Sequence, residues 1–169
     1  LRYKDCLMSE RFLCLEKIDY ICKVYGHKNY RYKNYNNNMK YYDREQELAE
    51  MKAIQAKSFD EFSKMTVLKG RRRIGKPPLG CLSMEGTDMV YLFASRKSEA
   101  ELCKEYSEII RLSLGEFVPE GIVKFKDIFG LLMSIGKHRP FNMFIDEFQE
   151  FLYVNQAIYS DIQNLWDKE

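Results

Sequence analysis

Long hydrophobic runs are missing from this 169-residue sequence, whose richest apolar stretch, residues 89–94, is only six residues long. A membrane-spanning helix needs about 20 apolar residues, so we expect no membrane partner. An apolar block followed by a small-residue cleavage site is also missing near the start, which argues against a secretory signal and favours a cytoplasmic protein. With 9 Gly and 4 Pro, the composition excludes collagen-like and low-complexity chains.

Paired cysteines are missing as well. The five cysteines are odd in number and widely spaced, without any Cys-x-x-Cys pair: Cys6, Cys14, Cys22, Cys81 and Cys103. This pattern supports neither a disulfide framework nor a zinc site. We therefore expect reduced thiols, as is usual in the cytosol.

What is present, 46% hydrophobic and 31% charged residues, is typical of a folding chain with one modest core. The charge is uneven, because residues 1–38 hold 8 Lys/Arg and 4 Asp/Glu although the whole chain has a net charge of only +2. We divide the sequence at this point into an N-terminal extension (1–38) and a domain (39–169).

The extension has little regular pattern. Apolar residues between Cys6 and Cys22 recur at mixed spacings of three and four and predict a short helix. Residues 25–38 are rich in Tyr, Lys and Asn without any period. We expect the extension to be a poorly ordered tail or sequence that is not native to the domain. Alternatively, its interleaved aromatic and basic side chains bind single-stranded nucleic acid by stacking and phosphate contacts.

From residue 39 onward, helix and strand patterns alternate. Apolar, β-prone runs predict strands at residues 65–69, 89–94 and 141–145. Helix starts are predicted at side chains that can cap free N–H groups, namely Asp43 with Gln46, Ser98 with Glu101, and Asp127. A last helix carries an apolar stripe of Ile158, Ile162, Leu165 and Trp166. Nearly continuous apolar strands between amphipathic helices predict an α/β fold, a parallel sheet flanked by helices.

The first chemical motif follows the predicted strand at 65–69 directly. It fits G-x-x-x-x-G-K and consists of Gly70, Arg71, Arg72, Arg73, Ile74, Gly75 and Lys76. Glycines let such a loop curl until its N–H groups point at phosphate oxygens, and the lysine brings a positive charge to the outer phosphates. The motif predicts a nucleotide-binding loop, in which the arginines either contact phosphate or DNA or point to solvent.

The second motif is a pair of acids, Asp146 and Glu147, directly after the predicted strand at 141–145. In a nucleotide hydrolase the first carboxylate of such a pair holds Mg²⁺, usually through water. The second polarises the attacking water as a general base. Taken alone, the two acids could equally cap the next helix; together with the loop, they predict a site for ATP and Mg²⁺.

The domain resembles the archaeal-type ATPase family, a group of AAA-related P-loop ATPases that often carry a C-terminal nuclease-like domain. The resemblance rests on residues 39–48, 67–76, 90–99, 144–149 and 162–167. It implies an incomplete AAA-type P-loop NTPase sheet, with residues 70–76 around the phosphates of ATP, Asp146 on the metal and Glu147 activating water. It also implies that the adenine lies near residues 42–45.

The sequence departs from the family in three respects, one of which is that residues 1–38 match nothing in it. Where the family has the Thr or Ser whose hydroxyl binds Mg²⁺, this sequence has Pro77, followed by Pro78. Proline lacks both the hydroxyl and the N–H, and Pro78 disfavours a helical conformation of Pro77, so we expect weak nucleotide binding and slow hydrolysis. The family also implies a strand beyond residue 169 that lies between the loop strand and the acid strand. We therefore expect open apolar edges there and marginal stability.

The sequence thus predicts an ATP-binding protein, an ATPase by resemblance, that works on an unidentified DNA or protein client. Two alternatives stay open. In one, the scaffold is a non-enzymatic remnant that binds a partner. In the other, residues 1–38 and the arginines of the loop form a nucleic-acid-binding module.

Overall fold

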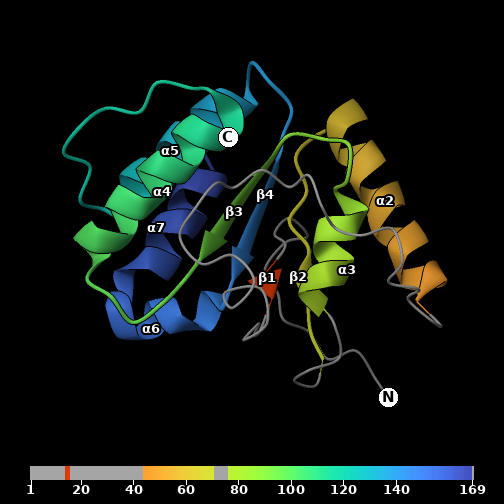
Figure 1. The fold of residues 1–169 in the computed structure, drawn as a ribbon, viewed down its shortest axis with the longest axis horizontal. Helices are drawn as coiled ribbons and strands as arrows, with labels where there is room; N and C mark the ends of the chain where they lie inside the picture. The colour runs from red at the N-terminus through yellow and green to blue at the C-terminus, as the bar shows by residue number, and fades with distance from the viewer. Residues whose placement is uncertain (1–13, 16–43, 71–75, 169) are drawn as a thin grey trace.

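The computed structural model describes residues 14–15, 44–70 and 76–168 (Figure 1). They form a mixed α/β fold with a small parallel sheet, so the predicted class is confirmed. The strands are β1 (Cys14–Leu15), β2 (Val67–Leu68), β3 (Met89–Phe93) and β4 (Asn142–Asp146), in the spatial order β2-β1-β4-β3. The five-residue strands β3 and β4 form the body of the sheet, and the two-residue strands β1 and β2 extend it.

Helices cover both faces of this sheet. They are α2 (Glu45–Asp60), α3 (Lys76–Ser83), α4 (Glu99–Leu114), α5 (Phe125–Gly136), α6 (Phe151–Val154) and α7 (Ala157–Trp166), with a 3-10 turn η1 (Phe148–Glu150) before α6. Figure 1 shows α4, α5 and α7 on one side of the strands and α2 and α3 on the other. Across the described part of the chain, no helix has the length and apolar character needed to span a bilayer.

Side chains alternate between the two faces along each strand. Val90, Leu92 and Ile145 belong to the main hydrophobic core, together with α4, α5 and α7. Tyr91 and Phe144 belong to the opposite face, where their rings stack with centroids 5.1 Å apart. By the same alternation, Asp146 shares the face of Phe144 and not that of the main core.

β1 occupies the position between β2 and β4. Its register aligns Leu15 with Leu68 on one side and with Asp146 on the other. We expected this position to be empty and residues 6–22 to be helical, and at Cys14–Leu15 both expectations are wrong. The reason is that the pairing joins segments far apart in the chain, which periodicity within the extension cannot reveal. The remaining residues of the extension lie outside the described part of the chain.

Two helix starts differ from the sequence patterns. α3 begins at Lys76, so Pro77 and Pro78 both lie in its first turn. The expectation that Pro78 moves Pro77 away from a helical conformation is therefore wrong, because a following proline disfavours the helical region without forbidding it. Proline also loses no bond in a first turn, where the N–H groups have no intrahelical acceptor. α2 begins at Glu45, and its predicted capping residue Asp43 lies outside the described residues.

α4 begins with the predicted capping box. The Ser98 hydroxyl accepts the N–H of Glu101, whose carboxylate accepts the N–H of Ser98 in return. α5 begins at Phe125, two residues before Asp127, so the predicted Asp127 cap is wrong. The N–H of Phe125 donates instead to Glu99 Oε1 at 2.8 Å, which lies on α4.

Glu99 therefore joins three parts of the helical layer. Besides the N–H of Phe125, its carboxylate accepts hydrogen bonds from Asn155 Nδ2 at 2.9 Å and from Lys124 Nζ at 3.5 Å. Burial alone would raise the pKa of Glu99, but the three hydrogen bonds and the charge of Lys124 outweigh it and hold this pKa below its ordinary value.

We expect Glu99→Ala to lower the free energy of unfolding by about 2–3 kcal/mol at neutral pH, because it leaves the Phe125 N–H and the Asn155 amide without their acceptor. Since the folded-state pKa is depressed, the charged form stabilises the fold above the ordinary glutamate pKa, and this contribution is lost as the pH falls through the folded-state pKa. The difference in free energy of unfolding between this variant and the wild-type chain should therefore become smaller below about pH 4. Urea unfolding across pH measures it.

The matched control is Glu108→Ala, which removes an exposed glutamate from the same helix, where it only faces Arg111 at 3.4 Å. We expect a change within about 0.5 kcal/mol for this variant. Equal losses in the two variants, or a gap for Glu99→Ala that does not change with pH, would contradict the role of the Glu99 carboxylate.

Candidate functional site

The described residues of both chemical motifs lie at the carboxyl-terminal edge of the sheet. β2 leads into the loop at Gly70, and β4 ends at Asp146. Since Leu68 and Asp146 both align with Leu15, they lie level with each other, two interstrand spacings or about 10 Å apart. The start of the loop and the acidic pair therefore meet at one edge. The central loop residues lie outside the described part of the chain: Arg71, Arg72, Arg73, Ile74 and Gly75.

Lys76, the last residue of the loop motif, is the first residue of α3 and is only 5% exposed. Its Nζ donates to the carbonyl oxygen of Gly70 at 2.6 Å. The ammonium group thus lies back over the start of the loop, and not out in solvent.

Asp146 is completely buried and accepts two hydrogen bonds. The Tyr91 hydroxyl donates to Oδ2 at 2.7 Å, and the N–H of Glu147 donates to Oδ1 at 2.9 Å. Burial raises the pKa of Asp146 to about 7, although both hydrogen bonds lower it; the Glu147 carboxylate raises it further and the Lys76 ammonium lowers it. Lys76 therefore lies close enough to Asp146 for its charge to act on this carboxylate. One residue of the loop motif is thus near the acidic pair.

Glu147 has an unusual backbone. Its φ of 53° and ψ of 36° make it the only non-glycine residue with a positive φ among the described residues. Such a conformation costs on the order of 1 kcal/mol and is enriched at functional sites. Glu147 is 5% exposed, and its carboxylate accepts a hydrogen bond from Gln149 Nε2. It precedes η1 but makes no side-chain capping bond there, so helix capping does not explain this acid.

The sequence patterns did not identify two residues of the candidate site. Tyr91 holds the Asp146 carboxylate from β3, and strand alternation was the signal that could have placed it on the same face. Gln149 holds Glu147 from η1, and its Oε1 is buried without a hydrogen-bond partner. The only signal for Gln149 was its nearness to Glu147 in the sequence.

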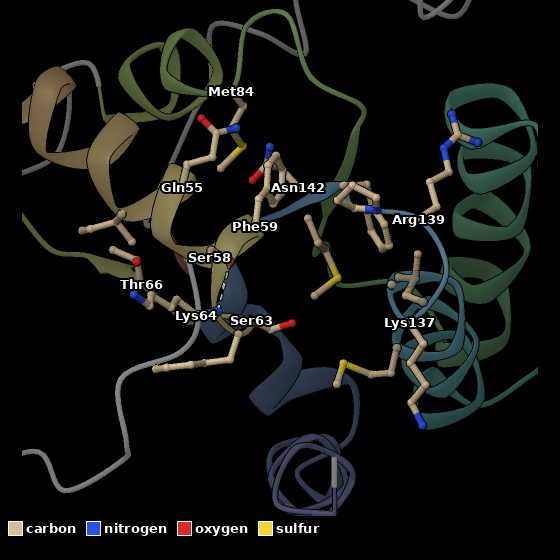
Figure 2. Close-up of a pocket in the computed structure, with 18 of the residues that line it drawn as sticks. Gln55, Ser58, Phe59, Ser63, Lys64, Thr66, Met84, Lys137, Arg139 and Asn142 are labelled. Atoms are coloured by element: carbon tan, nitrogen blue, oxygen red, sulfur yellow. Dashed lines mark hydrogen bonds between the residues drawn. The ribbon is translucent and has the colours of Figure 1, made fainter.

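No metal centre or cavity marks the site by itself. Within the described ranges, no three His, Cys, Asp or Glu side chains gather closely enough to hold a metal ion. A cleft of about 600 Å³ lies at the opposite, amino-terminal edge of the strands (Figure 2), and neither Lys76 nor the two acids line it. The candidate site therefore rests on strand register and side-chain chemistry.

Gly70, Lys76, Asp146 and Glu147 are thus brought to one edge of the sheet, and their assignment depends on this chain alone. Comparison with known proteins identifies no family for the chain, since no protein-family model, no curated protein and no solved structure matches it.

Proposed function

We propose that the protein binds ATP at the carboxyl-terminal edge of the sheet, between the loop at residues 70–76 and the acids Asp146 and Glu147. The observation that carries the proposal is the register across β1, which puts Leu68 and Asp146 level with each other. In open parallel sheets, ligands bind outside the carboxyl ends of the strands. The strand order also supports an incomplete AAA-type P-loop NTPase sheet, in which β1 takes the place between the loop strand and the acid strand.

Lys76 is the residue that we assign to the outer phosphates. Its ammonium group is nearly buried and bonded to the Gly70 carbonyl oxygen. A phosphate oxygen carries far more negative charge than a carbonyl oxygen and makes a stronger, charge-assisted hydrogen bond. We expect the ammonium group to exchange the carbonyl for a phosphate when ATP binds.

Asp146 is the residue that we assign to Mg²⁺. Mg²⁺ usually keeps several waters and takes one or two carboxylates together with substrate phosphates, so a cluster of three acids is not needed. Each oxygen of Asp146 accepts one hydrogen bond in the structure and has a further lone pair available. When bound, Mg²⁺ would neutralise charge on the β- and γ-phosphates.

Glu147 is the residue that we assign to the attacking water. Its carboxylate lies next to Asp146 in sequence and is held inward by Gln149. A carboxylate in this position can accept a proton from water as the water attacks phosphorus. Hydrolysis is expected to be slow, because Pro77 offers no hydroxyl to the metal at the start of α3.

MgATP at millimolar concentration is expected to raise the melting temperature of the full chain, and Lys76→Ala should abolish this rise. Binding to the folded state alone adds about 2.7 kcal/mol when the ligand is present at 100 times its Kd. Thermal unfolding with and without MgATP measures the effect. The matched control is Lys69→Ala, which removes an exposed lysine just before the loop and should leave the rise intact.

Either of two results would reject ATP binding at this site. One is an unchanged melting temperature of the wild-type chain with MgATP, which would favour the non-enzymatic remnant. The other is a rise that Lys76→Ala and Lys69→Ala reduce equally, since a general loss of positive charge would then explain it.

A further inference from the structure

The cleft at the amino-terminal edge of the strands has no part in the proposed ATP site. Its volume is about 600 Å³, within the range of pockets that bind ligands. Figure 2 shows Gln55, Ser58 and Phe59 of α2 on one side, Lys137 and Arg139 on the other, and Asn142 at the start of β4 between them. The cleft therefore lies between the two helical layers, at the end of the sheet away from Asp146.

The lining of this cleft mixes polar and apolar side chains, and its apolar part is rich in methionine. Four of its residues are methionines, and four more are large aromatic side chains: Met51, Met84, Met133, Met143, Phe59, Phe62, Phe141 and Trp166. Methionine is unbranched and polarisable, so surfaces built from it adapt to apolar partners of different shape. Met-rich grooves are a known way to bind the apolar face of an amphipathic helix.

The titratable groups that line the cleft are all basic. They are Lys64, Lys137, His138 and Arg139, and no Asp or Glu lines the cleft among the described residues. Lys64 and Arg139 also contact acids outside the lining, Glu61 at 2.9 Å and Asp88 at 2.7 Å. Arg139 binds Asp88 through both Nε and Nη2 and also lies 3.7 Å from Glu116, so an acidic partner has to compete with these pairs. The basic groups of the lining favour an apolar partner that carries negative charge at its flanks.

Part of the apolar lining is open to solvent. On the α2 side Phe59 is 40% and Phe62 is 52% exposed, and both line the cleft. A small amphiphile inside the cavity would leave most of this surface in water, whereas a helix laid across it would cover the rim as well. We propose that the cleft binds an amphipathic helix of a partner protein, with apolar side chains facing α2 and β4 and acidic side chains facing Lys64, Lys137 and Arg139.

The test uses the full chain with ¹³C-labelled Met and Ile methyl groups. The probe is a synthetic helical peptide of about 20 residues with Leu at i, i+3, i+4 and i+7 and Glu elsewhere. Addition of the peptide should shift the methyl signals of Met51, Ile54, Met133 and Met143 saturably. The signals of Ile109 and Ile158, which lie outside the cleft lining, should stay in place.

Matched variants distinguish peptide binding in the cleft from non-specific binding elsewhere on the protein. Phe62→Ser and Lys137→Glu should each weaken peptide binding at least about tenfold. Phe117→Ser and Lys104→Glu make the same changes at exposed residues outside the cleft lining, and should leave the affinity unchanged.

Three results would overturn the proposal. The first is the lack of a saturable shift with the acidic peptide. The second is equal or tighter binding of the same peptide with Lys in place of Glu, which would remove the charge argument. The third is a shift of the cleft methyls by decanoate but not by the acidic peptide, which would assign the cleft to a small anionic amphiphile.

Discussion

Pro77→Thr should raise the rate of Mg²⁺-dependent ATP hydrolysis roughly a hundredfold, which corresponds to about 2.7 kcal/mol in activation free energy. The substitution restores a hydroxyl group and an N–H group in the first turn of α3, directly after the buried Lys76. In P-loop NTPases a hydroxyl of the loop binds Mg²⁺, so this prediction rests on the proposed function. Release of phosphate from MgATP under saturating conditions measures the change.

Pro77→Val is the control that isolates the hydroxyl. Valine has nearly the shape of threonine and also restores the N–H, but it cannot bind a metal ion. We expect Val to leave the rate close to that of the wild-type chain. Equal rates for the Thr and Val variants would show that the hydroxyl is irrelevant, and ordinary turnover by the wild-type chain would show that Pro77 does not impair it.

Phe125→Ala should lower the free energy of unfolding by about 4 kcal/mol. Phe125 begins α5 and is 1% exposed. Its ring lies 4.6 Å from that of Phe151, 5.8 Å from that of Tyr106 and 6.3 Å from that of Phe129, measured between centroids. Removal of this ring would leave a cavity between α4, α5 and α6 that rigid neighbours cannot fill.

Guanidinium chloride unfolding measures this loss, and Phe117→Ala supplies the control. Phe117 is 81% exposed in the connection between α4 and α5, so its removal should change the free energy of unfolding by no more than about 0.5 kcal/mol. A loss below about 1 kcal/mol for Phe125→Ala would mean that the aromatic cluster is not the centre of the core.

Local chemistry explains which parts of the fold were predictable. β3 and β4 follow from short apolar runs, and the cap of α4 follows from Ser98 and Glu101, which are three residues apart. The start of α5 was misplaced because its N–H acceptor, Glu99, is 26 residues away from Phe125. β1 was missed for the same reason, since its partners are distant in the chain and its two residues carry no strand pattern of their own.

The site was predictable to a similar extent. Lys76, Asp146 and Glu147 could be predicted as site residues because the chemistry proposed for them depends on spacing within short motifs. They come together at one edge because β1 lies between β2 and β4. No sequence motif predicts this position of β1. The raised pKa of Asp146 comes mainly from burial and also from the charge of Glu147, while Tyr91 and Lys76 oppose the rise, so it needs the folded chain. The left-handed backbone of Glu147 has no signature in the sequence either.

β1 also constrains how the protein is made. Leu15 pairs with Leu68 and with Asp146, which follows it by about 130 residues in the chain. Parallel pairs of this separation form late, because a long loop must close before the contact forms. During synthesis on the ribosome, β1 therefore waits roughly 7 to 26 seconds, at about 5–20 residues per second, before its second neighbour β4 has been made. The translation of β4 therefore decides when β1 can complete its pairing.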